Sequence, residues 1–233
     1  MAPKKKWTRW DLPYCADPEN HVLVTTREGV FWRRKRTKTV LNEALARNAD
    51  LSRIAGPAAR RVVQKLRPFL RGLDTGRVTL RISNGLRKAL KEKNKLDYSS
   101  LQGLEMQRNH SMDQLLRASY TVVPGEKGLS LTIDLFPDCV KKQNQLVTHF
   151  YFEAVLVHGD VATGHDLRVD STESALYAFG GELAEACVLA LPLPAEQPWM
   201  VLLKVSCLEG HELAMHPRHY GMKVVASGVG NSG

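Results

Sequence analysis

Residues 147–157 read VTHFYFEAVLV, and this stretch decides the fold class. It is apolar at both odd and even positions and rich in aromatic and β-branched residues, which is typical of a central strand buried on both faces. Shortly before it, apolar residues alternate with Ser130, Thr132 and Asp134, which indicates a strand with one buried face and one wet face. The alternating apolar residues are Leu129, Leu131, Ile133 and Leu135.

More strand-like runs follow up to residue 226, and no helix of useful length separates them. Strands that succeed one another without a crossover helix pair in antiparallel fashion, most simply in a β-sandwich. Turn residues such as Gly180-Gly181 and Glu209-Gly210 lie between the runs. The expected strands are Leu167–Asp170, Ala175–Phe179, Cys187–Leu193, Trp199–Leu208, Glu212–Met215 and Tyr220–Ala226.

The N-terminal half begins with a predicted hairpin. His21–Thr26 (HVLVTT) and Gly29–Arg34 (GVFWRR) are short β-type runs joined by Arg27-Glu28-Gly29. A short helix is then expected over Val40–Ala46.

A stronger helix is predicted to begin at Pro57, because proline is favourable in a first turn. Its apolar stripe is Ala59, Val62, Val63, Leu66 and Leu70. Pro68 should end or kink it.

Another helix is predicted over Arg77–Asn94, although Asn84-Gly85 weakens its continuity. The segment 96–110 has no clear period and is expected to be a loop. Ser111 followed by Gln114 predicts a capping box at the start of a short helix that ends near Arg117. The predicted fold is therefore α+β, with an N-terminal hairpin and a basic helical segment followed by an antiparallel β-sandwich.

Charge is distributed unevenly along the chain. The net charge is +9; residues 1–120 hold 26 Lys and Arg against 11 Asp and Glu, and residues 121–233 hold 7 against 13. This dipole suits either a polyanion or head-to-tail association between copies. Together with the change of period it predicts two regions, 1–117 and 118–233, or one continuous domain that includes the hairpin.

The composition is that of a globular protein, with 43% apolar and 24% charged residues among 233. The basic start MAPKKKWTRWD is not followed by an apolar segment, and no run approaches the roughly 20 apolar residues of a membrane span. Four distant cysteines without a C-x-x-C pair indicate buried free thiols in a reducing compartment. We therefore expect a cytoplasmic protein with no cofactor and no membrane association.

The stretch HELAMHPRH (residues 211–219) resembles the H-E-x-x-H motif of zinc proteases, but its spacing is wrong. His211 and His216 are five residues apart rather than four, and Pro217 breaks the helix that the motif requires. A site built from His216, His219 and a distant histidine such as His158 or His165 stays open. Turn or surface histidines are the alternative, and no metal is expected.

Other catalytic motifs are missing from the sequence. It holds no G-x-S-x-G elbow, no P-loop and no dinucleotide fingerprint. The acidic stretch of Asp166, Asp170 and Glu173 lacks the spacing of an EF-hand loop. We therefore predict that the protein is not an enzyme.

The segment FWRRKRTK (residues 31–38) is the most basic in the chain, and two interpretations compete for it. It could join helical arginines and lysines in binding phosphate backbones, with Trp7, Trp10, Phe31 and Trp32 stacking on bases. Alternatively, these charges are solvated faces of elements whose apolar sides cover the sheets. The candidate binding residues are Arg33, Arg34, Lys35, Arg36, Lys38, Arg60, Arg61 and Lys65.

The order of features resembles an uncharacterised family of bacterial proteins of the Bacteroidetes type over nearly the whole chain. The resemblance is carried by FWRRK, AGPAARRVVQKLRPFL, RISNGLRKALKEKNKLDYSSLQGLE, VTHFYFEAVLV and WMVLLKVSCLEG…YGMKVV. It implies the same domain order and a cytoplasmic origin, and no activity is known for that family.

These observations predict a non-enzymatic structural or interaction protein. It would bind another protein or a second copy of itself through its basic N-terminal half, with the β-sandwich as scaffold. The alternative is a nucleic-acid-binding protein that uses the basic hairpin and helices on phosphate backbones.

Overall fold

The structure is a computed structural model of the chain. It describes residues 17, 19–25, 30–35, 42–125, 128–164, 166–192 and 197–229. The chain forms two compact units, Met1–Ala46 and Arg47–Gly233. The change of period near residue 117 falls inside the second unit, because the helices before it pack on the strands after it.

The first unit contains the predicted hairpin. Strand β1 (His21–Thr25) pairs antiparallel with β2 (Val30–Arg34), and Leu23 lies opposite Trp32. The predicted turn at Arg27-Glu28-Gly29 lies outside the described residues.

The centre of the second unit is an antiparallel sheet in which β5 (Val147–His158) and β9 (Pro198–Glu209) are neighbours. Strand β6 (Arg168–Glu173) pairs with β5, and β11 (Tyr220–Val229) pairs with β9. Two strands of two residues each extend the sheet: β7 (Tyr177–Ala178) on β5 and β10 (Glu212–Leu213) on β9.

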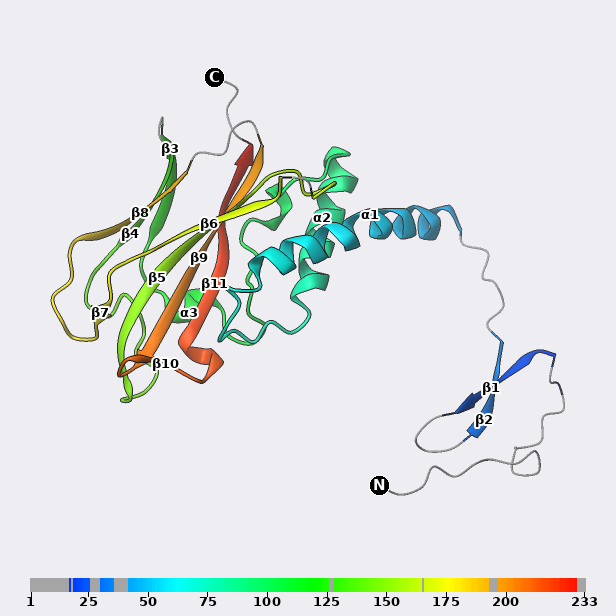
Figure 1. Ribbon diagram of the computed structural model, residues 1–233, viewed down its shortest axis with the longest axis horizontal. Helices are drawn as coiled ribbons and strands as arrows, with labels where there is room; N and C mark the ends of the chain where they lie inside the picture. Colours follow the sequence, from blue (N-terminus) through cyan, green and yellow to red (C-terminus); the bar gives the residue numbers. More distant parts are fainter. Residues whose placement is uncertain are drawn as a thin grey trace. The chain divides into compact units, whose positions relative to one another are not determined.

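Strand β5 is buried on both faces, as the sequence of residues 147–157 predicts. Phe152 and Ala154 belong to one hydrophobic cluster, whereas Val155 and Val157 belong to another on the opposite face. Two buried faces require a layer on each side of the sheet. Helices α1 (Glu43–Leu66) and α2 (Val78–Lys93) lie on one side, and three further strands lie on the other (Figure 1).

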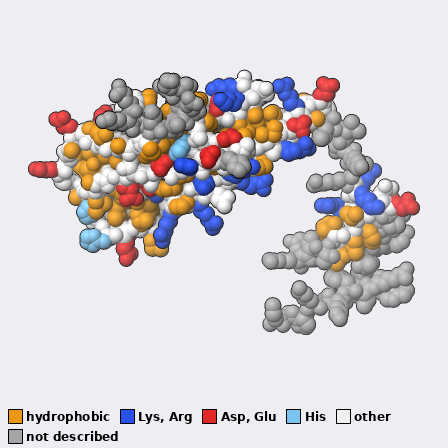
Figure 2. Space-filling view, turned by 45° about the horizontal axis from the view of Figure 1, so that its top comes forward, with side chains coloured by type: hydrophobic (Ala, Val, Ile, Leu, Met, Phe, Trp, Pro, Cys, Tyr) orange, Lys and Arg blue, Asp and Glu red, His pale blue; other side chains and the backbone are white. Residues whose placement is uncertain are grey.

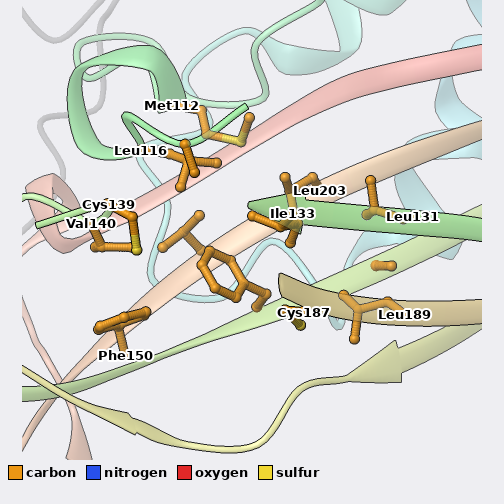
Figure 3. Close-up of a cluster of buried hydrophobic side chains, with 14 of the residues drawn as sticks. Met112, Leu116, Leu131, Ile133, Cys139, Val140, Phe150, Cys187, Leu189 and Leu203 are labelled. Carbon is orange, nitrogen blue, oxygen red and sulfur yellow. The ribbon is translucent and has the colours of Figure 1, made fainter. Parts of the chain in front are cut away.

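Those three strands form the second sheet, in the order β3 (Tyr120–Gly125), β4 (Gly128–Asp134) and β8 (Ala186–Pro192). The apolar positions of β4 and β8 face the same cluster as Leu203 of β9 (Figure 3). Strand β3 escaped prediction because Pro124 and Gly125 end its short apolar run, and proline is tolerated in an edge strand. The fold is thus α+β with antiparallel sheets that curl into a half-barrel, and the predicted β-sandwich is not confirmed.

Helix α1 (Glu43–Leu66) is one helix of 24 residues with Pro57 inside it, so residues 43–46 of the short helix predicted over Val40–Ala46 belong to this longer helix. The predicted helix start at Pro57 is therefore wrong. A proline normally disfavours the helical conformation of the preceding residue by contact with its Cβ, but that residue is Gly56, which has none. The helix ends at Leu66, two residues before Pro68, as predicted.

Helix α2 (Val78–Lys93) runs through Asn84-Gly85 without a break. A Cβ atom on Gly85 would lie 2.4 Å from Cδ2 of Leu101, in the 3-10 turn η2 (Ser99–Leu101). Glycine is therefore present here for close packing of a neighbouring segment and does not mark a helix end.

The capping box at Ser111 does not form. Helix α3 (Met112–Leu115) begins there, but the Ser111 side chain makes no cap hydrogen bond. The Glu105 carboxylate accepts the Met112 amide instead, at 3.1 Å, and burial raises the pKa of Glu105 above its ordinary value. A residue outside the local motif thus satisfies the helix start.

Candidate functional site

An open cavity of about 1090 Å³ lies in the second unit, between the end of α1 and the start of α2. Four arginine side chains line it, and no carboxylate does. We call this feature the arginine cavity. Its lining consists of Arg60, Val63, Gln64, Arg67, Pro68, Leu70, Arg71, Thr75, Gly76, Arg77, Val78 and Thr79. Figure 2 shows that Lys and Arg side chains gather over the helical part of this unit.

Helical spacing and a fixed turn bring these arginines together. Arg60, Gln64 and Arg67 recur at intervals of four and three residues, which places them along one side of α1 and its end. Arg71 follows in the turn, next to Gly72, whose φ is 86°. A Cβ atom on Gly72 would lie 2.6 Å from the Tyr220 ring, so the turn packs directly on β11.

Asp74 fixes the next part of the turn. Its carboxylate accepts the Gly76 amide at 3.3 Å and the Asn109 side-chain amide at 2.8 Å, and its carbonyl oxygen accepts the Arg108 amide at 2.9 Å. Arg77 then adopts a left-handed conformation, with φ 59° and ψ 25°, immediately before α2. No side chain caps this helix start, and its first turn contains no acidic residue.

The guanidinium groups of the four cavity arginines have no hydrogen-bond or ion-pair partner in the part of the chain that the structure describes, and all four residues are exposed. Two other arginines nearby are tied to the backbone. Arg61 donates to the carbonyl oxygens of Ala162 at 2.5 Å and Val161 at 3.4 Å. Arg81 donates to three carbonyl oxygens between residues 105 and 107 at 2.8–3.0 Å. Unlike Arg61 and Arg81, the cavity arginines therefore keep their side-chain donors available for a ligand.

The sequence-predicted binding residues do not form one group. Arg60 lines the cavity, Lys65 is exposed on α1 outside the lining, and Arg61 holds the 160–164 loop. Arg33 and Arg34 are exposed on β2 in the first unit.

Lys35 is also in the first unit, where its ammonium donates to the Glu19 carbonyl oxygen. Arg36 and Lys38, together with Trp7 and Trp10, lie outside the described residues. Sequence reasoning missed Arg67, Arg71 and Arg77. A pattern in the sequence could have indicated them: Arg67 and Arg71 flank Pro68, and Arg77 follows directly after a segment that contains two glycines.

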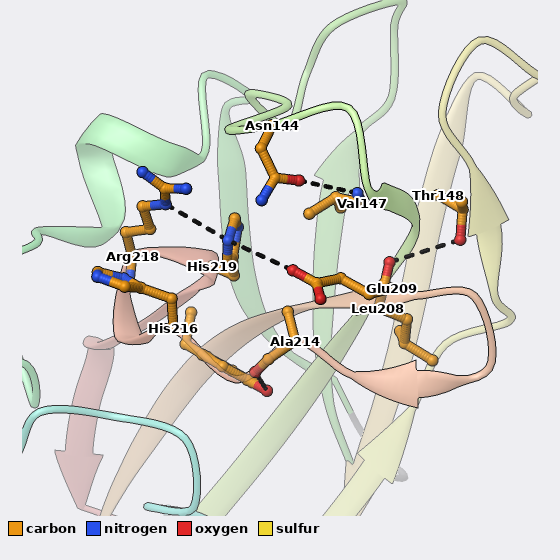
Figure 4. Close-up of polar contacts among 10 residues, drawn as sticks. Asn144, Val147, Thr148, Leu208, Glu209, Ala214, His216, Arg218 and His219 are labelled. Atoms are coloured by element: carbon orange, nitrogen blue, oxygen red, sulfur yellow. Dashed lines mark hydrogen bonds and ion pairs between the residues drawn. The ribbon is translucent and has the colours of Figure 1, made fainter.

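Two histidines of HELAMHPRH belong to the 3-10 turn η3 (Pro217–His219), with His216 as its N-cap and His219 as its last residue, whereas His211 is exposed outside it. His216 accepts the Arg218 amide at 3.1 Å, and buried His219 lies 3.9 Å from the Glu209 carboxylate (Figure 4). Burial lowers the pKa of His219, and the nearby charge of Arg218 lowers it further.

The other histidine that sequence reasoning considered, His158, pairs with Asp170 at 2.9 Å, and His165 lies outside the described residues. Ring centroids of His110 and His216 are 6.1 Å apart. No group of three or more His, Cys, Asp or Glu within the described ranges is arranged to hold a metal ion.

Two further sets of chemically reactive side chains are buried in the second unit. Lys204 and Glu153 form a buried ion pair between β9 and β5, with Nζ 3.1 Å from Oε2. Cys139, Cys187 and Cys207 are buried free thiols, and burial raises the pKa of each, to about 12 for Cys207. A raised pKa disfavours the thiolate, so these cysteines are poor nucleophiles.

Among the described helices, none combines the length and the apolar character needed to cross a bilayer. No family model matches the chain, and no curated protein sequence matches it significantly. The resemblance to an uncharacterised Bacteroidetes-type family stays a prediction.

Proposed function

We propose that this protein is a non-enzymatic interaction protein that binds an anionic partner through the basic surface of α1 and α2. The observation that carries the proposal is the arginine cavity, where four guanidinium groups line one concavity without a carboxylate among them. Arginine side chains without internal partners keep their donors available for a partner's acidic groups.

The preferred partner is an acidic surface of another protein or of a second copy of the chain. Residues 121–233 carry 7 basic against 13 acidic residues, so one copy offers both signs of charge. Contact between the basic helices of one copy and the acidic strands of another would be heterologous. The sheet scaffold, which we infer to be a β-sandwich because both sheets contribute to one core cluster, would hold these surfaces rigidly.

Nucleic acid is the second candidate partner. It is favoured by the choice of arginine over lysine at all four charged positions of the cavity, because guanidinium groups match phosphate oxygens in a bidentate manner. Against it, the described part of the chain contains no helix-turn-helix or aromatic stacking platform beside the cavity. Either function is proposed for the cytoplasm, without a cofactor.

Size-exclusion chromatography with light scattering at low and high salt separates these candidates. We expect a defined oligomer, or a complex with an acidic protein, that dissociates at high salt. Comigration with a mixed DNA and RNA oligonucleotide pool at low salt would favour the nucleic-acid function instead. A monomer that binds neither would contradict the proposal.

A further inference from the structure

The arginine cavity has features of a small-molecule site that the surrounding basic surface lacks. We propose that it binds a small molecule carrying an oligophosphate group, of the class of inorganic tripolyphosphate or a nucleoside triphosphate. This inference goes beyond the proposed function, because such a ligand would bind the isolated protein without a macromolecular partner.

Charge is the first argument. Arg60, Arg67, Arg71 and Arg77 line one cavity, and their positive charges repel one another. The only carboxylate of the segment 66–79, that of Asp74, already accepts two amide groups. A ligand that brings several negative charges close together would neutralise the four guanidinium groups, whereas one carboxylate could neutralise only one.

Donor geometry is the second argument. Each guanidinium presents parallel N–H donors that match two oxygens of a phosphoryl group. The hydroxyl groups of Thr75 and Thr79 also line the cavity and can donate to phosphoryl oxygens. A chain of phosphoryl groups offers enough oxygens for all of these donors, and a single phosphate does not.

Size and lining are the third argument. The volume of about 1090 Å³ slightly exceeds the range of about 300–1,000 Å³ that is typical of small-molecule pockets, so the cavity has room for more than a single phosphate. Apolar side chains of Val63, Leu70 and Val78 share the lining with the charged ones. The site could therefore hold an uncharged body attached to the phosphate chain, such as a nucleoside.

Arg77 allows a clean test, because its backbone is left-handed at φ 59°. Glycine adopts this conformation more easily than arginine, so Arg77→Gly removes a cavity charge without requiring a change in the fold. Lys91→Ala is the matched control. It also removes one positive charge from α2, at an exposed position outside the cavity lining.

The experiment is isothermal titration calorimetry of the full chain at low salt with inorganic tripolyphosphate, a nucleoside triphosphate and hexaglutamate. We expect both phosphate ligands to bind, Arg77→Gly to weaken binding about tenfold, and Lys91→Ala to weaken it less than about twofold. Arg67→Lys, which keeps the charge but loses the planar donors, should also weaken binding. Circular dichroism and a thermal melt confirm that each variant is folded.

Comparison of tripolyphosphate with the nucleoside triphosphate shows which part of the ligand the cavity recognises. Tighter binding of the nucleoside triphosphate would show that the apolar lining contacts the nucleoside, and equal binding would show recognition of the phosphate chain alone; both support the proposal. It is overturned if neither ligand binds, if hexaglutamate binds equally well, or if Lys91→Ala loses as much affinity as Arg77→Gly. The titration measures binding of a small ligand, whereas the chromatographic test measures association with a macromolecule or a second copy, so the failure of one is distinguishable from the failure of the other.

Discussion

Arg77 and Arg81 lie one helical turn apart at the start of α2, yet the backbone holds only Arg81. Its guanidinium donates to three carbonyl oxygens of the 105–107 segment, whereas the Arg77 guanidinium lines the cavity and has no hydrogen-bond or ion-pair partner in the described chain. Burial lowers the pKa of Arg81 below its ordinary value. The same residue type therefore has a structural role at one position and a free side chain at the other.

Arg81→Ala should accordingly destabilise the protein. It removes three charge-assisted hydrogen bonds and leaves partly buried carbonyl groups without donors, so we expect a loss of about 2–3 kcal/mol in the free energy of unfolding. Arg77→Ala is the control and should change it by less than about 0.5 kcal/mol. Urea denaturation measures both. Equal losses would show that Arg77 also holds the fold.

The ion pair between Lys204 and Glu153 predicts a second stability effect. Both side chains are about 7% exposed, so Lys204→Met would leave a buried carboxylate without its partner. We expect a loss of about 3–5 kcal/mol. The double variant Lys204→Met/Glu153→Leu should recover most of it, since a buried pair can be replaced by apolar residues at little cost. A single variant as stable as wild type would refute this role.

Gly85 predicts a packing effect between α2 and η2. Gly85→Ala places a methyl group where Cδ2 of Leu101 and the Ser100 carbonyl oxygen already lie, so we expect a loss of about 1–3 kcal/mol despite the better helix propensity of alanine. In a double-mutant cycle, Leu101→Ala should reduce the effect of Gly85→Ala. Independent, additive effects would show that the two residues are not coupled.

His219 predicts a dependence of stability on pH. Burial and the charges of Arg218 and His216 lower its pKa in the folded chain, and Glu209 only partly opposes them. As pH falls below the unfolded value of about 6.5, the unfolded chain therefore binds a proton that the folded chain resists. Stability from this group is present at neutral pH and is lost as pH falls.

The contribution should reach at most about 1.4 kcal/mol per pH unit. Urea denaturation at several pH values between 7 and 5 should show a shallower slope for His219→Gln than for wild type. His211→Gln, at an exposed position, is the control. An unchanged slope in His219→Gln would mean that another group determines the acid sensitivity.

Periodicity predicted the strands around β5 and β9 because burial there follows directly from residue type along the chain. It could not predict that α1 continues through Pro57, where Ala55, Ala58 and Ala59 around the proline pack into the core against the strands. It also could not predict that Glu105 caps α3 in place of Ser111, because that contact is made by a loop that pairs with β11. Local sequence patterns therefore fail to predict helix limits and caps where a segment distant in the sequence supplies the stabilising contact.

The candidate site was predictable only in part. Charge counting pointed to the basic helices and included Arg60, but it could not separate Arg61, which binds backbone carbonyls, from its neighbour. Arg67, Arg71 and Arg77 join Arg60 only because the turn after Pro68 folds back onto Tyr220. The tertiary structure therefore determines which arginine side chains remain without a partner, and the sequence alone does not reveal it.

The most direct test of partner binding compares two double charge reversals by size-exclusion chromatography with light scattering at low salt. Arg67→Glu/Arg71→Glu alters the cavity, and Lys88→Glu/Lys91→Glu makes the same change in net charge on α2 outside it. We predict that the cavity variant loses the oligomer or complex that wild type forms, while the control retains it. Equal retention or equal loss in the two variants would contradict binding through the arginine cavity.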